Sequence, residues 1–229
     1  MSSGGKKHNP ATTRLRLLDA AERLFGEHGY NGVGMRALTE AARVNLAATA
    51  YHFGSKKTLY AETFLRRFRV VNAERVKQLA TADREARGLP LTVECIVDCL
   101  LRPAAQVGLE HPAFDKLVGR SMLAPPKFLH AYLKAEFEPV VKLFIGALER
   151  ALPAVPVNIL NLRLGLAMGA IMMLGMQMSS IRMKRDPKRE AAILKELVRF
   201  AASGLASPPA TVGAELALVR PPVKTKRNA

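Results

Sequence analysis

The stretch that decides the fold runs from residue 13 to residue 60 and reads TRLRLLDAAERLFGEHGYNGVGMRALTEAARVNLAATAYHFGSKKTLY. Its apolar residues first recur at helical spacing, which predicts a helix that Thr12 or Thr13 caps and Gly29 ends. Two short helical patterns follow, at residues 35–42 and 46–52. Two short helices separated by about three residues have the spacing of a helix-turn-helix.

The second short helix can present a surface suited to the major groove of DNA. Val44, Thr49 and Phe53 are expected to point inward, towards the supporting helices. The residues expected to point outward have either hydrogen-bonding groups or small apolar side chains that allow close approach to DNA. They are Asn45, Leu46, Ala47, Ala48, Ala50, Tyr51 and His52. Ala47 and Ala48 permit close approach and contact with thymine methyl groups. From the pattern alone, an alanine-rich core hairpin explains this segment equally well.

Helical periodicity continues on the carboxy-terminal side. Ser55 is the expected N-cap of a long helix that reaches about residue 82, and Lys56 in its first turn adds a cation where a helix already favours phosphate. Further helices are expected near residues 91–109, 113–122, 126–152, 156–183 and 187–205. The prediction is an all-α protein of nine helices, with a disordered basic arm (1–11), a DNA-binding domain (12–60), a helical domain (61–206) and a disordered basic tail (207–229).

Charge and composition narrow the function. Lys and Arg number 35 against 19 Asp and Glu, a formal charge of +16, so a nucleic acid or an anionic membrane surface is the natural partner. The most apolar segment, Leu164 to Met176, falls short of the roughly 20 residues that span a bilayer, so no membrane partner is expected. No secretory signal opens the chain, and Cys95 and Cys99 are interpreted as small core residues, with a redox pair as the alternative, so a cytoplasmic protein is predicted.

No catalytic pattern stands out. The sequence has no glycine-rich phosphate loop, zinc-spaced His/Cys cluster or nucleophile elbow, so neither an enzyme nor a metal or other cofactor is expected.

Three segments carry a family resemblance: LLDAAERLFGEHGY (17–30), MRALTEAA (35–42) and VNLAATAYHFGSKKTLY (44–60). Together they resemble the DNA-binding domain of the TetR family of transcriptional regulators. The resemblance implies a three-helix head, a long fourth helix, and a carboxy-terminal helical domain that dimerises and usually holds an effector pocket. It also implies that Arg36 reaches DNA, that the outward residues from Leu46 to His52 form the recognition surface, and that Lys56 binds phosphate.

Four positions depart from the family pattern. Gly34 replaces a Ser or Thr that caps the second helix and contacts phosphate, so that contact is expected to be missing. Arg43 replaces the usual turn glycine, which implies either a tolerated positive φ or an altered turn. Thr49 stands where a larger aliphatic residue is common, and Ala50 replaces a side chain that often reaches the DNA backbone.

The family architecture assigns the dimer interface to residues 156–205. Gly165 and Gly169 would allow close helix approach, while Leu166, Met173 and Met176 supply apolar contact. A core-only role for this helix is the alternative. Two heads on one symmetric homodimer predict a palindromic double-stranded operator.

An effector pocket is harder to predict. Six apolar residues could line one or simply pack a core: Phe114, Leu117, Met122, Phe128, Met168 and Met172. Arg120 could meet a ligand carboxylate or pair with Glu110 or Asp115. The segment that begins GRSMLAPPKF at residue 119 loosely resembles fatty-acid-responsive repressors of the family, which implies a fatty-acyl effector.

The predicted function is therefore a homodimeric, sequence-specific DNA-binding transcriptional regulator, a repressor released by a small apolar effector. The alternative is a sequence-independent nucleic-acid-binding or architectural protein, because a charge of +16 would serve it equally well. A membrane-surface protein is a third possibility, but the segment from Leu164 to Met176 has apolar residues all round the helix, which argues for burial. Lys6 and Lys7 of the arm either follow the minor groove or are merely solvated.

Overall fold

The computed structural model describes residues 10–123, 125–180 and 186–209. These residues form nine α-helices and no strand, which confirms the predicted all-α architecture. The helices are α1 (Pro10–His28), α2 (Met35–Ala42), α3 (Leu46–Phe53), α4 (Lys56–Glu85), α5 (Val93–Glu110), α6 (Pro112–Leu123), α7 (Leu129–Ala151), α8 (Val157–Ser180) and α9 (Pro187–Ala206). None of these described helices combines the length and apolar character needed to cross a membrane.

Several helix boundaries differ from the sequence predictions by a few residues, those of α1 and α4 among them. Helix α1 begins at Pro10, so residues 10 and 11 of the predicted arm are helical. Proline fits the first turn of a helix because the amide hydrogen that it lacks has no helical partner there. Helix α4 continues to Glu85, beyond the predicted end near residue 82. The rest of the arm, with Lys6 and Lys7, and residues 210–229 of the predicted tail lie outside the described residues.

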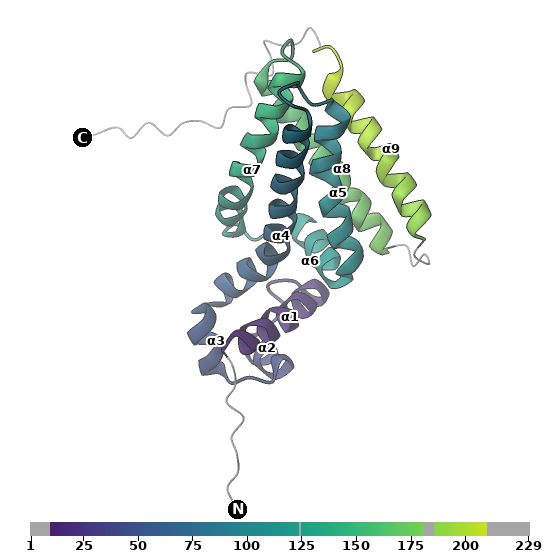
Figure 1. Cartoon of the computed structure of the whole chain (residues 1–229). Coiled ribbons are helices and arrows are strands. Elements are labelled where there is room, and N and C mark those ends of the chain that lie inside the picture. Colours follow the sequence, from purple (N-terminus) through teal and green to yellow (C-terminus); the bar gives the residue numbers. More distant parts are fainter. Residues whose placement is uncertain (1–9, 124, 181–185, 210–229) are drawn as a thin grey trace, which may run out of the picture.

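We call α1 to α3 the head and α5 to α9 the body. Figure 1 shows the head at one end of the molecule, with α4 running from it along the body. The first turns of α4 pack on the head through Leu59 and Phe64, both fully buried, whereas Leu79 near its other end packs in the body. A continuous helix of 30 residues therefore joins the two parts.

The head core does not end at residue 60. Buried residues Phe114, Leu117 and Val118 of α6 and Leu129 of α7 belong to the same apolar cluster as Leu17 and Phe25 of α1. Contact between α1 and α6 is close: a Cβ added at Gly26 would lie 3.0 Å from the carbonyl oxygen of Ala113. A displacement of α6 would therefore press directly on the first helix of the head.

A second cluster forms the body core, from the end of α4 with α5, α7, α8 and α9. Cys99 is buried in it and Cys95 lies against it, which agrees with their interpretation as small core residues. Burial, reinforced by the neighbouring Cys95, raises the pKa of the Cys99 thiol to about 12, so that thiol stays protonated and unreactive at neutral pH.

Candidate nucleic-acid interface

The turn between α2 and α3 is built around a left-handed residue. Arg43 has φ 52° and ψ 49°, so the chain keeps the turn and accepts the positive φ at a non-glycine residue. The amide of Val44 donates to the carbonyl of Thr39 at 2.9 Å, and the guanidinium of Arg16 donates to the carbonyl of Arg43 at 2.8 Å. These bonds hold the angle between α2 and α3 although the usual glycine is absent.

The two short helices differ in their caps. Gly34 precedes α2 without a side-chain cap, as its departure from the family pattern predicts. Asn45 caps α3, because its side-chain oxygen accepts a hydrogen bond of 2.7 Å from the amide of Ala48. Asn45 is one of the residues predicted to face DNA. Its side chain is exposed there, but its oxygen already serves the helix.

Helix α3 is anchored by one face and exposed on the other. Thr49 and Phe53 are buried and Val44 packs against the head core, as expected. The outward face carries Tyr51, 82% exposed, and Leu46, 55% exposed, together with exposed Ala47 and Ala50. Ala48 and His52 are only half-buried members of this face. The alternative of a core hairpin is therefore wrong, because a core segment would not leave Tyr51 and Leu46 exposed to water.

Cations lie on the helices that precede and follow α3. Arg36 is exposed on α2. The ammonium of Lys56 lies 4.4 Å from the centre of the Tyr30 ring, and partial burial lowers the pKa of this lysine. A cation held over an aromatic face keeps fewer accessible rotamers, so Lys56 is positioned before any anion arrives.

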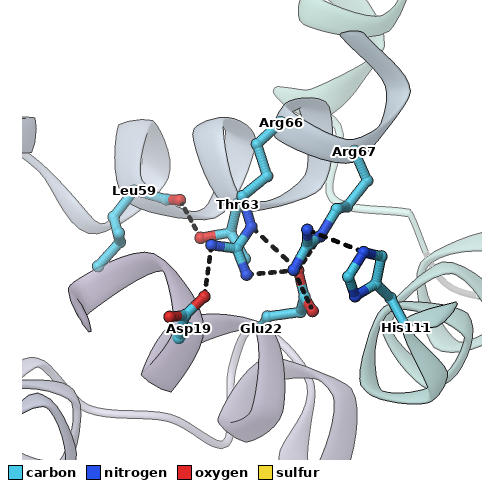
Figure 2. Close-up of polar contacts among 7 residues, drawn as sticks. All are labelled: Asp19, Glu22, Leu59, Thr63, Arg66, Arg67 and His111. Carbon is cyan, nitrogen blue, oxygen red and sulfur yellow. Dashed lines mark hydrogen bonds and ion pairs between the residues drawn. The ribbon is translucent and has the colours of Figure 1, made fainter. Parts of the chain in front are cut away.

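A cluster of charged residues, missed by the sequence analysis, fixes α1 against α4. The buried carboxylate of Glu22 accepts hydrogen bonds from Arg66 at 2.6 Å and Arg67 at 3.1 Å, and Arg66 also reaches Asp19 at 2.8 Å (Figure 2). Arg67 further contacts Nε2 of His111, just before α6, at 3.1 Å. Glu22 and the arginines lie far apart in sequence, and no spacing rule pairs them.

Arg120 was expected to enter a pocket or to pair with an acid. Instead its side chain is exposed and donates to the backbone carbonyl of Glu27 at 3.0 Å, near the end of α1. The last turn of a helix leaves carbonyl groups without helical partners, and a guanidinium can satisfy one of them. Arg120 thus makes a second link between α6 and the head.

The other predicted pocket residues are divided between the two cores. Phe114 and Leu117 are buried in the head core, where Phe114 lies edge-on to Phe68, and Phe128 packs against Tyr30 at 5.0 Å. Met168 packs on the body core and Met172 touches both clusters. The side chain of Met122 lies outside the described residues.

The predicted dimer residues share an exposed face of α8. Gly165, Leu166, Gly169 and Met173 are all exposed, with Leu166 at 66% and Met173 at 56%. The side chain of Met176 lies outside the described residues. Three further exposed apolar residues were not predicted, namely Val157 and Leu162 on α8 and Phe200 on α9. Leu162 precedes Leu166 by four residues, and that spacing could have revealed it.

Among the residues that the structure describes, no three His, Cys, Asp or Glu side chains are grouped to hold a metal ion. The head itself offers an exposed helix, α3, with a cation on the helix before it and another at the start of the helix after it.

Comparison with known proteins supports this interpretation. Residues 17–63 match the family model "Bacterial regulatory proteins, tetR family", and residues 94–204 match "Tetracyclin repressor-like, C-terminal domain". The chain is 41% identical over 51 residues to the HTH-type transcriptional repressor AcnR of Corynebacterium glutamicum, covering 22% of this chain and 27% of AcnR. It is 50% identical over 48 residues to the HTH-type transcriptional regulatory protein RaaS of Mycobacterium tuberculosis, covering 21% and 22% of the two chains. The similarity thus spans about a quarter of each curated relative.

Solved structures match over most of the chain. The fatty acid degradation regulator FadR of Bacillus halodurans superposes with a TM-score of 0.58 at 16% identity, covering 90% of this chain and 97% of FadR. At that identity the likeness concerns the fold. Two family matches that together cover more than half of the chain, a head with an exposed third helix, and a body of matching fold lead to one conclusion: the chain belongs to the TetR family of bacterial regulatory proteins.

Proposed function

We propose that this protein is a homodimeric, sequence-specific DNA-binding transcriptional regulator, a repressor released by a small effector. The observation that carries the proposal is the outward face of α3. Tyr51 and Leu46 are exposed on this face, whereas Thr49 and Phe53 are buried on the opposite face and anchor the helix to the head. A helix presented in this way can enter the major groove. Arg36 is exposed on α2 and Lys56 is held over Tyr30 at the start of α4, so both cations are available to bind DNA phosphates.

The homodimer is supported by the exposed apolar face of α8 and α9. Leu166, Met173 and Phe200 are each more than half exposed, although side chains of this kind are stabilised by burial. A second copy of the chain would cover them, and a two-fold axis would place two heads on a palindromic operator. Sedimentation equilibrium of Leu166→Glu tests this assembly, with Leu143→Glu on the exposed face of α7 as the matched control. A monomeric Leu166→Glu supports the proposal, and an unchanged dimer contradicts it.

The path for effector release runs through α6. This helix packs on α1 at Gly26, bonds to the end of α1 through Arg120, and reaches α4 through the 2.6 Å bond between Ser121 and Tyr60. An effector that moves α6 would change the spacing of the two heads. A fatty-acyl effector remains a prediction, and thermal-shift measurements with a fatty-acyl panel and unrelated ligands test it. A shift with another class alone would contradict it.

The alternative function is sequence-independent binding by an architectural protein. It predicts equal affinity for unrelated duplexes at equal salt, whereas a regulator prefers one palindrome by orders of magnitude. A cytoplasmic location and the absence of enzymatic activity form part of the proposed function.

Selection of bound fragments from the source genome tests the proposal directly. A shared palindrome is expected among the fragments that the full chain retains. Tyr51→Ala should then lose affinity for it while the dimer persists, and Tyr132→Ala on α7 serves as the control. Retention of fragments without any shared sequence would favour the architectural alternative.

A further inference from the structure

Helix α3 offers the major groove unusually few hydrogen-bonding groups. Its sequence, LAATAYHF, contains no Lys, Arg, Asp, Glu, Asn or Gln. Its polar side chains are those of Thr49, Tyr51 and His52, and Thr49 is buried behind the helix. The bidentate pairs through which proteins usually distinguish guanine or adenine therefore have no donor set on this helix.

The neighbouring Asn45 does not fill this gap. An asparagine reads adenine with both its oxygen and its amide nitrogen. The oxygen of Asn45 already accepts the 2.7 Å hydrogen bond from the amide of Ala48. Adenine recognition would have to use the second lone pair of this oxygen while the amide keeps the orientation of the N-cap, so Asn45 is not free to turn towards a base.

The outward face of α3 does offer exposed apolar side chains, most of them small. Leu46 is 55% exposed in its first turn, beside the exposed methyl groups of Ala47 and Ala50. The major-groove edge of DNA carries one apolar group, the 5-methyl group of thymine. Apolar side chains that face a groove gain from contact with this group and gain little from the other base edges.

The cations near α3 have a different role from the apolar residues of the helix. Lys56 is held over Tyr30, and Arg36 is exposed on α2, so the nearby cations lie outside α3 itself. Contacts of this kind with phosphate fix the position of a protein on DNA without reading its sequence. Arg36 is the one described cation on α2 or α3 with a side chain long enough to reach a base edge as well.

We infer that this protein recognises its operator chiefly through thymine methyl groups, which Leu46, Ala47 and Ala50 of α3 contact. The inference rests on the proposed function and adds to it the chemical group that is read. It makes the thymine-containing steps of each half-site the positions that determine specificity.

Deoxyuridine tests the inference without changing the protein, because uracil is thymine without the methyl group. Each thymine of the selected palindrome is replaced in both half-sites, and the dissociation constant for the full chain is measured by fluorescence anisotropy at fixed salt. Burial of one methyl group corresponds to about fourfold in affinity, so about fourfold is expected for each contacted methyl that is removed. A cytosine at a contacted position should bind more weakly than 5-methylcytosine at the same position.

A protein variant assigns the contact to α3. In the double variant Leu46→Ser/Ala47→Ser, the ratio of the dissociation constants for deoxyuridine-containing and thymine-containing DNA should fall towards one. The reason is that the apolar partner of the methyl group has been removed. Leu143→Ala, at a leucine on α7 that is 50% exposed, is the control and should keep the full effect.

The outcomes separate this inference from the proposed function. Specific binding to a palindrome with no deoxyuridine effect at any thymine, or the same effect in the double variant, overturns the methyl readout and leaves the regulator standing. Guanine positions that depend on Arg36 as the dominant determinants would also overturn it. Equal binding to every duplex would instead remove the proposed function itself.

Discussion

The ammonium of Lys56 lies 4.4 Å from the centre of the Tyr30 ring. Lys56 begins α4, whereas Tyr30 follows the end of α1, so this contact joins the entry of the long helix to the far end of the first one. The aromatic face directs a cation that would otherwise sample many rotamers, and the start of α4 adds the favourable field of a helix N-terminus for an anion.

Replacement of Lys56 by Ala should therefore weaken DNA binding without changing which sequence is preferred. We expect roughly a tenfold loss of affinity, because one phosphate contact is lost in each subunit. The slope of the logarithm of affinity against the logarithm of salt concentration should decrease in magnitude by about one for each subunit. Anisotropy titrations at several salt concentrations measure both. Lys77→Ala, on the exposed part of α4, is the control, and a changed sequence preference in Lys56→Ala would contradict the assignment.

Glu22→Gln should destabilise the protein. The carboxylate is buried between Arg66 and Arg67, and the neutral amide cannot balance two guanidinium groups. Both arginines retain some access to water, so we expect a loss of about 2–3 kcal/mol in the free energy of unfolding. Urea denaturation measures it, with Glu149→Gln at an exposed position of α7 as the control. Equal stability of the two variants would show that the cluster contributes nothing.

Glu62 should make stability depend on pH in the acid range. Hydrogen bonds from Arg69, then the charges of Arg69 and Arg14, hold the pKa of this carboxyl below its ordinary value of 4.5. A lowered folded-state pKa gives stability that is present above the unfolded pKa and disappears as pH falls through the folded one. The difference in melting temperature between wild type and Glu62→Gln should thus be largest near neutral pH and shrink below pH 4.5. A difference that is constant with pH would exclude this origin.

Thr49→Val should stabilise the head. Among the described residues, the hydroxyl oxygen of Thr49 is the one buried side-chain polar atom without a hydrogen-bond partner. Valine has nearly the same shape and removes the unpaired hydroxyl, so a gain of about 1 kcal/mol is expected. Chemical denaturation measures the gain, and Thr39→Val is the comparison because the Thr39 hydroxyl bonds to the carbonyl of Arg36. Lower stability of Thr49→Val would mean that the hydroxyl is satisfied in solution.

Much of this protein could be predicted from its sequence because helical periodicity, caps and turn residues are local properties. The spacing of Thr49 and Phe53 identified the inward face of α3, and the break at residues 43–45 identified the turn. Ser55 was found as the N-cap of α4 from its neighbours alone. The exposed face of α8 followed from glycines four residues apart, once the family architecture was assumed.

Only the tertiary structure decided how the parts are joined. The Glu22 cluster, the bond from Arg120 to the carbonyl of Glu27, and the union of α6 with the head core link residues distant in the chain. Burial creates the need for such partners, and burial depends on which helices pack together. A sequence pattern shows which face of a helix is apolar. It does not show which helix will pack against that face, or which charged side chains the packing will bring together.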